Sequence, residues 1–302
     1  MRGTYKEILA GVKTDDSVFA AIYTLDEGDD WKDPNVWIKA NPNLDVTVRS
    51  AYLQDQVLQA TNQPSMEVAI RTKNFNQWMS SSDVWLSNDL LCKHSRSIDI
   101  SEFIGRPTFI GIDLAAVSDL TAVSLNTIND NGKYIFKTFY YIPSSCLEGH
   151  ANSEKYKEWK RNGSLIVCPG NVTDYDYILN DILRWRDSGV LIEKIAYDTY
   201  NATQFAINAT EQSLPMEPFS QALWSFNRCT KELERCLKIG NIEIDNNEVT
   251  RWCFANVALK TDHADNVKPV KGAGDLNKID GVIAMLEAFG SLIITPKYNN
   301  LI

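Results

Sequence analysis

The sequence predicts an α/β fold built on a mixed sheet, in which an antiparallel meander of three strands is followed by parallel strands and flanked by helices. Two observations support this prediction. Three apolar, β-branched runs follow one another between residues 107 and 142, and Asn131-Gly132, a strong hairpin signal, separates the last two. From residue 152 onward, helical periodicity alternates with one further apolar run at 191–198.

The first hundred residues differ in character from the rest of the chain. Residues 17–25 (SVFAAIYTL) predict a strand, because they are apolar and β-branched and precede the acidic segment DEGDD. Residues 50–63 predict a helix with one apolar face, and residues 80–100 predict a connector with a short helix. One strand cannot bury both of its faces without partners. We therefore predict an incomplete unit over 1–100 and a separate domain over 101–302.

The domain over 101–302 contains its predicted elements in a definite order. Strands are predicted at 107–115, 120–128, 133–142 and 191–198, and helices at 152–162, 174–188, 201–212, 227–241 and 280–292. The fourth strand follows a helix, so we expect it to lie parallel to the first strand through a right-handed crossover. Three hairpin strands followed by strand–helix alternation is the element order of the RNase H-like nuclease fold.

The composition narrows the function classes. The chain has 302 residues, 44% of them hydrophobic, which is typical of a globular protein. The net charge of −9 argues against a protein that coats nucleic acid permanently. It does not exclude a nuclease, because a carboxylate cluster that binds metal is itself negative. No apolar stretch is long enough to span a membrane, and the N-terminus lacks the apolar core of a secretory signal.

The cysteines do not suggest a zinc site or a disulfide framework. The six cysteines contain no C-x-x-C pair, which predicts reduced thiols in a cytoplasmic protein. A zinc site built on Cys253 and His263 would need two more ligands at workable spacing, so zinc is disfavoured.

Three aspartates occupy positions that suggest metal chemistry. Asp113 in FIGIDLA and Asp198 in IAYDTYNA each end an apolar run, and Asp280 in KIDGVIAML begins the last predicted helix. If their strands are neighbours, the three side chains converge at one edge of the sheet. Phosphodiester hydrolysis can use two divalent ions, and carboxylates hold the oxygen-seeking ions Mg²⁺ and Mn²⁺. The sequence therefore predicts a metal-dependent phosphodiesterase site.

Each of these residues also has a simpler explanation. An aspartate at a strand end is commonly a turn former or a helix N-cap, and Asp280 suits the cap because Gly281-Val282-Ile283 begins a helix. Asp119, six residues after Asp113, is a weaker candidate whose alternative role is to order the loop. Basic residues gather near the third aspartate, and a solvated loop is the favoured interpretation of them: Lys268, Lys271 and Lys278.

Five segments occur in an order that resembles a known family. They are GIDLAAVSDLTA, IAYDTYNATQF, FSQALWSFN, RWCFANV and KPVKGAGDLNKIDGVIAMLEAFG. Together they resemble the nuclease domain of the large subunit of tailed-phage terminases, the DNA-packaging motors. In the first hundred residues, FAAIYTLDEGDDWKDPNVWIKANPNL is similar to the tail of the packaging ATPase domain. The resemblance covers nearly the whole chain.

The resemblance implies roles for single residues and a reaction. It makes Asp113, Asp198 and Asp280 the catalytic, metal-binding acids, with Asp119 and Lys278 as supporting residues and Trp252 and Asn256 as structural ones. The implied reaction is endonucleolytic cutting of concatemeric double-stranded DNA at the start and end of packaging, with Mg²⁺ or Mn²⁺, as two ions, as cofactor. The implied partners are DNA, the terminase small subunit and the portal protein, in the cytoplasm of a bacterial host.

The sequence departs from a full terminase large subunit in one respect. It contains no G-x-x-x-x-G-K-[ST] loop, because GAGDLNK has neither the spacing nor the final Lys-Ser/Thr pair. We therefore expect no ATPase activity, and we expect the chain to be the C-terminal portion of a terminase. A truncated reading frame, a split gene and a fragment made for expression would each explain that.

Three other functions stay open at this point. A folded but inactive prophage remnant, or a docking module of the packaging motor, would keep the fold without the activity. An actin-like sugar kinase or ATPase is less favoured, because IAYDTYNAT lacks the second glycine-rich phosphate loop of that class. A resolvase or transposase with the same metal chemistry would be expected to have a more basic surface.

Overall fold

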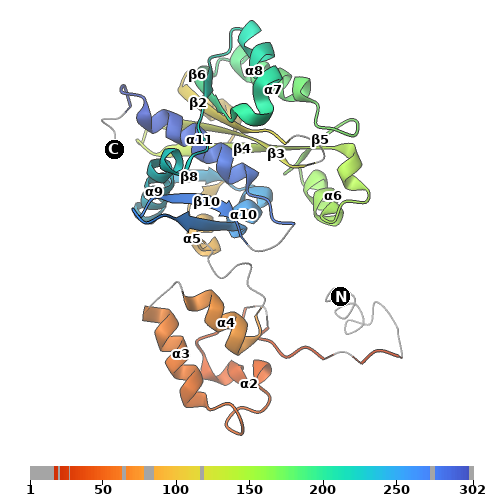
Figure 1. The fold of residues 1–302 in the computed structure, drawn as a ribbon, viewed down its shortest axis with the longest axis vertical. Coiled ribbons are helices and arrows are strands. Elements are labelled where there is room, and N and C mark those ends of the chain that lie inside the picture. Colours follow the sequence, from red (N-terminus) through yellow and green to blue (C-terminus); the bar gives the residue numbers. More distant parts are fainter. Residues whose placement is uncertain are drawn as a thin grey trace. The chain divides into compact units, whose positions relative to one another are not determined.

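The computed structural model describes residues 17–19, 21–26, 28–62, 66–77, 85–115, 119–272 and 276–298. The chain divides into two compact units, Met1–Ser82 and Asp83–Ile302 (Figure 1). Among the helices in these ranges, none combines the length and the apolar character that crossing a membrane requires.

The first unit consists of helices around a small aromatic core. Its elements are η1 (Pro34–Val36), α2 (Trp37–Ala40), α3 (Ser50–Asn62) and α4 (Glu67–Phe75). Phe75 is fully buried, and the rings of Trp31 and Trp37 pack against it with centroids 6.0 and 5.8 Å away. The predicted helix from Ser50 is confirmed.

The predicted strand at 17–25 is wrong. Its described residues, 17–19 and 21–25, form no strand. Phe19 is 92% exposed, whereas Leu25 is buried in the core of this unit. The apolar run suits a strand, but a strand also needs a partner for its backbone hydrogen bonds, and no other strand lies in the described part of this unit.

The second unit is built on an eight-stranded mixed sheet with the order β1-β8-β4-β3-β2-β6-β7, in which β5 pairs with β4. The strands are β1 (Ser95–Arg96), β2 (Pro107–Asp113), β3 (Thr121–Ile128), β4 (Tyr134–Pro143), β5 (Ile166–Cys168), β6 (Leu191–Tyr197), β7 (Met216–Pro218) and β8 (Ile242–Asp245). Strands β2, β3 and β4 form the antiparallel meander, and β6 lies parallel to β2. Both predictions are confirmed, and the fold is RNase H-like.

Helices cover both faces of this sheet (Figure 1). They are α5 (Asn88–Lys93), η3 (Ile100–Phe103), η4 (Ser144–Leu147), α6 (Ser153–Arg161), α7 (Tyr175–Asp187), α8 (Thr199–Glu211), α9 (Leu223–Ile239), α10 (Glu248–Ala255) and α11 (Asp280–Ile294). One apolar core lies between the sheet and α6, α9, α10 and α11, and a second lies between the sheet and α7 and α8.

A small antiparallel hairpin, β9 (Val257–Thr261) with β10 (Val267–Lys271), precedes the last helix and was not predicted. It corrects the solvated-loop interpretation of the basic residues. Lys268 and Lys271 lie on β10, and Lys278 keeps only 13% of its side chain exposed. The interpretation failed because VKPVK is short and contains a proline and two lysines, which resembles a loop as much as an edge strand.

Helix α11 packs closely on β2, which fixes where the start of the helix lies relative to the end of the strand. Side chains alternate along β2, so Gly111 and Asp113 face the same side. A Cβ atom at Gly111 would lie 2.5 Å from the Ala288 nitrogen and closer still to the Ala284 oxygen. The helix backbone therefore rests directly on the strand. Asp280 begins the helix one turn before Ala284, on the side where Asp113 ends the strand.

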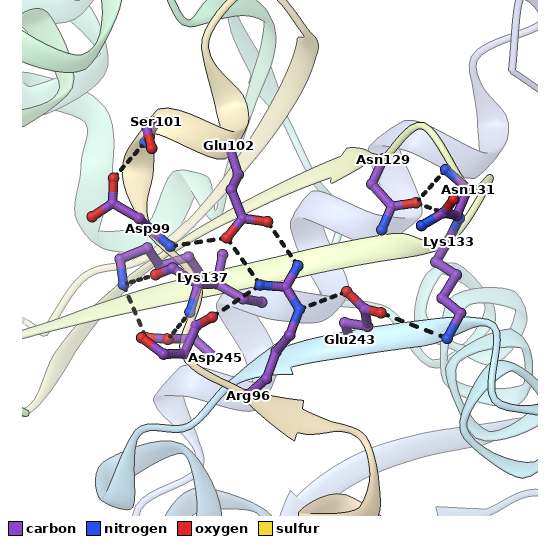
Figure 2. Close-up of polar contacts among 12 residues, drawn as sticks. Arg96, Asp99, Ser101, Glu102, Asn129, Asn131, Lys133, Lys137, Glu243 and Asp245 are labelled. Atoms are coloured by element: carbon purple, nitrogen blue, oxygen red, sulfur yellow. Dashed lines mark hydrogen bonds and ion pairs between the residues drawn. The ribbon is translucent and has the colours of Figure 1, made fainter.

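An ion-pair network binds the start of the second unit to the far edge of the sheet (Figure 2). Arg96 on β1 donates to Glu102 of η3 at 2.7 Å and to Glu243 of β8 at 2.7 Å. Lys137 pairs with Asp245 at 3.0 Å, and the Ile98 amide donates to the same carboxylate at 2.9 Å. Each of these ion pairs alone adds little to the free energy of folding, but Arg96 joins Glu102 and Glu243 at once and so holds β1 alongside β8.

Candidate active site

Two of the predicted acids meet at the ends of neighbouring parallel strands. Asp113 is the last residue of β2, and Asp198 directly follows β6. Because Ile112 pairs with Tyr197, the two aspartates occupy adjacent positions at the same sheet edge. The parallel pairing of β2 with β6 is what brings these residues, distant in sequence, together.

The third acid, Asp280, comes from the helix α11, which packs on one face of the sheet. Asp280 is the first residue of α11 and is 9% exposed, and the N-cap position belongs to Ile279, with no side-chain cap hydrogen bond. The N-cap interpretation of Asp280 is therefore wrong. Its Oδ2 atom is buried and has no hydrogen-bond partner in the described ranges. A buried carboxylate oxygen without a partner is costly, and such groups mark sites that await a ligand.

The carboxylates act on one another electrostatically. Burial raises the pKa of Asp113 well above its ordinary value, and the charge of Asp280 is the next largest cause, with Asp198 and Asp119 adding to it. Burial, followed by the charge of Asp119, raises the pKa of Asp280 to about 6. Lys271 opposes the rise of both pKa values. The four predicted acids therefore interact electrostatically as one cluster. The nearby lysines do not offset their repulsion, because the pKa values of Asp113 and Asp280 stay raised.

The two predicted supporting residues form an ion pair. Lys278 Nζ lies 2.6 Å from Asp119 Oδ2, which connects the segment after β2 to the segment before α11. The Asn256 side chain donates to the Lys278 carbonyl at 3.1 Å and so orders the same segment. Trp252 packs its ring 5.2 Å from that of Trp159, away from any carboxylate named above.

The sequence interpretation missed one residue near the cluster and assigned another to a solvated loop. Glu287, two turns after Asp280 on α11, is fully buried, and burial followed by the charges of Asp113 and Asp198 raises its pKa well above the ordinary value. A signal existed, because a helix that is apolar on all sides is buried and any acid in its middle is buried with it. Lys271 on β10 is the other, and its signal was hidden by the unpredicted hairpin.

The type of donor atoms in this cluster fits a hard divalent cation, although the carboxylates do not surround one point. Within the described residues, no three His, Cys, Asp or Glu side chains are placed to hold a metal ion. The cluster nevertheless offers only carboxylate oxygens, the ligands that Mg²⁺ and Mn²⁺ prefer, and one of them is an orphaned buried atom. The zinc site considered for Cys253 and His263 is not formed, because Cys253 is buried in the core whereas His263 is exposed in the β9–β10 turn.

A pH effect on stability follows from the raised pKa of Asp280. Its folded-state pKa of about 6 exceeds the ordinary 3.8, so between these values the folded protein retains a proton that the unfolded chain releases. Stability from this group is therefore full below about pH 4 and is lost as the pH rises through 6. The difference corresponds to about 3 kcal/mol at most.

We expect Asp280→Asn to raise the melting temperature in EDTA more at pH 7.5 than at pH 5. Thermal melts of the two proteins at both pH values test this. An equal effect of the substitution at the two pH values would contradict it.

Comparisons with known proteins agree on one family. Residues 12–295 match the family model described as terminase large subunit, endonuclease domain. Protein YmfN of Escherichia coli (strain K12) is 31% identical over 98% of this chain and 67% of its own length. The terminase large subunit of Enterobacteria phage HK97 is 26% identical over 92% of this chain and 55% of its own length.

Solved structures of two large terminases are also similar to this chain. The crystal structure of the HK97 bacteriophage large terminase is similar with a TM-score of 0.61 and 25% identity, over 95% of this chain and 60% of that chain. The magnesium-bound large terminase nuclease of thermophilic phage G20c is similar with a TM-score of 0.45 and 12% identity, over 70% of this chain. This chain thus spans between about half and two thirds of the length of its full-length relatives.

Proposed function

Since this chain belongs to the terminase large subunit endonuclease-domain family, we propose that it is a divalent-metal-dependent endonuclease that cuts double-stranded DNA. The observation that supports the proposal most is the placement of Asp113, Asp198 and Asp280 at the same end of an RNase H-like sheet, where their charges repel one another. A divalent cation would offset this repulsion and would give the buried Asp280 Oδ2 atom a partner.

The three acids would hold the cation, and neighbouring groups would serve the reaction. Bound Mg²⁺ or Mn²⁺, as one ion or as a pair, supplies an activated water and neutralises charge on the phosphoryl oxygens. Asp113, adjacent to the two other acids, is suited to contact every bound ion. Asp119 and Lys278, joined by their ion pair, would fix the segments that border the site, and Lys271 would offer a positive charge to the DNA backbone.

We further propose the biological setting that the family implies. The substrate would be concatemeric DNA cut at the start and end of packaging, with the terminase small subunit and the portal protein as partners, in the bacterial host cytoplasm. Residues 1–100 would correspond to the tail of the packaging ATPase domain and its linker, and residues 101–302 to the nuclease. ATPase activity is not expected, because the sequence has no P-loop.

Plasmid cleavage tests the proposed activity. We expect the intact chain to nick or linearise a supercoiled plasmid in Mn²⁺ or Mg²⁺ but not in EDTA. Asp198→Ala is expected to slow cutting at least about a hundredfold, the scale for removing one preorganised group that stabilises developing charge. Asp187→Ala, which removes an exposed aspartate at the end of α7, is the matched control and should cut normally.

The remaining outcomes separate the alternatives. Metal-dependent cutting that survives in Asp198→Ala would contradict the assigned site. No cutting by the intact chain, with the fold still stabilised by metal, would favour a module that requires the rest of the motor. No cutting and no response to metal would favour a folded, inactive remnant.

A further inference from the structure

Glu287 is an unusual residue for its place in the fold. It lies in the middle of α11, whose residues from Asp280 to Ile293 are all buried, and it is itself 0% exposed. Burying a carboxyl group among apolar side chains costs several kcal/mol unless partners compensate. Packing alone therefore does not account for an acid at this position, because a methionine or glutamine of similar volume would fill the same space.

Two hydrogen-bonding groups act on the Glu287 carboxylate. Its Oε1 atom accepts a long hydrogen bond from the Gln221 side chain at 3.4 Å, and the Ile112 backbone on β2, next to Asp113, also interacts with it and lowers its pKa. Gln221 precedes α9, and its carbonyl accepts from Lys268 of β10. The amide of Gln221 is thereby held between the hairpin and the buried carboxylate.

The charges that act on Glu287 are those of Asp113 and Asp198. By contrast, the acid that acts most on Asp280 is Asp119. Glu287 therefore interacts with the two acids at the strand ends, Asp113 and Asp198, and Gln221 contacts it from the side of β10.

We propose that Glu287 is a positioning residue whose carboxylate, held by Gln221, lies behind Asp113 and Asp198 and strengthens cation binding on that side of the site. This inference rests on the proposed metal-dependent function. A bound divalent cation would favour the ionised form of Glu287 despite its burial, and that negative charge would then add to the attraction the cation experiences in a medium of low dielectric constant. The Glu287 carboxylate also limits the orientations that the two ligands adopt, which is the usual role of carboxylates outside the coordination sphere.

The test is Mn²⁺ binding by the full chain without DNA, measured by isothermal titration calorimetry. We expect Glu287→Gln to weaken Mn²⁺ binding by about tenfold or more, the range for outer carboxylates of metal sites. Its melting temperature in EDTA should equal or exceed that of the natural protein, because a neutral amide replaces a buried acid. Gln221→Ala should weaken binding in the same direction but less, which keeps the inference testable if Glu287→Gln does not fold.

Asp181→Asn is the matched control. Asp181 is another buried acid, on α7 against the opposite face of the sheet, where it accepts a hydrogen bond from Tyr141 at 2.9 Å. Its substitution should lower the melting temperature and leave Mn²⁺ affinity unchanged, which is the signature of a purely structural acid.

The outcomes separate this inference from the proposed function. If the natural chain binds Mn²⁺ and Asp113→Asn does not, but Glu287→Gln and Gln221→Ala bind within twofold of the natural chain, the role of Glu287 is overturned and the site remains. If the natural chain binds no divalent cation, the proposed function fails and the inference fails with it.

Discussion

Asp113→Asn is expected to remove most of the gain in melting temperature that Mg²⁺ or Mn²⁺ gives to the natural chain. Ions that bind only the folded state stabilise it by about 2.7 kcal/mol at a hundred times the dissociation constant, which corresponds to about 4–6 °C for a chain of this size. The charges of Asp280, Asp198 and Asp119 all act on Asp113, so losing its charge should weaken any arrangement of ions at these acids.

The same substitution should have the opposite effect without metal. Burial and the charges of Asp280 and Asp198 disfavour the ionised form of Asp113, so the folded protein gains stability in EDTA at pH 7.5 when a neutral amide replaces the carboxyl group. We therefore expect Asp113→Asn to melt higher than the natural chain in EDTA and to respond little to Mn²⁺. A protein that is more stable but insensitive to metal is the trade expected at a binding site built from like charges.

Differential scanning fluorimetry across Mn²⁺ concentrations measures both effects. Asp130→Asn is a suitable control, because Asp130 is an exposed aspartate of the β3–β4 turn that pairs with Arg106 at 2.7 Å, far along the meander from Asp113. It should leave the Mn²⁺ response intact. An undiminished Mn²⁺ response in Asp113→Asn would remove Asp113 from the proposed site.

The sheet, and the positions of Asp113, Asp198 and Asp280 in it, could be predicted because local signals and topology agreed, whereas the role of these acids stays a prediction. Asp113 and Asp198 each end an apolar run, and the rule that parallel strands are joined by right-handed crossovers predicts that such runs are neighbours. The position of Asp280 required only helical periodicity after it. In these places each local preference favours the same fold, which is the condition under which sequence patterns are informative.

The other parts depended on tertiary contacts that leave little trace in local sequence. Residues 17–25 have the composition of a strand, but their environment in the first unit offers no described partner strand. The strands of the hairpin containing Lys271 are only five residues each and contain lysines, so they form through pairing with each other and packing against α9. Glu287 was missed for a different reason, since helical periodicity predicts the helix but not what the one acid in its interior contacts.

Gly111→Ala is expected to disrupt the second unit although it adds only one methyl group. The added Cβ would lie 2.5 Å from the Ala288 nitrogen and 3.0 Å from the Ala284 carbonyl carbon, with the Ala284 oxygen nearer still. These atoms are helix backbone, so no side chain can rotate away and α11 itself must shift. Overpacking of this kind costs about 3 kcal/mol at the upper end of its usual range.

The shift of α11 should also move the acids of the proposed site apart. α11 carries Asp280 and Glu287, whereas β2 carries Asp113, so separating the helix from the strand moves the acids apart. A displacement of about 1 Å can cost on the order of a hundredfold in rate when groups must be oriented together. We therefore expect Gly111→Ala to lower the melting temperature and, in the fraction that folds, to weaken the Mn²⁺ response.

Gly132→Ala provides the comparison that isolates the contact. Gly132 lies in the β3–β4 turn with φ +76° and nothing within 4 Å of an added Cβ, so its substitution costs only the backbone strain of about 1–2 kcal/mol. Chemical denaturation of both variants, with and without Mn²⁺, measures the difference. If Gly111→Ala loses no more stability than Gly132→Ala and keeps the full Mn²⁺ response, the close contact between α11 and β2 does not hold the acids together. A larger loss of both stability and the Mn²⁺ response in Gly111→Ala would mean that the site needs a glycine on β2, because only glycine lets α11 pack closely enough to bring the carboxylates together.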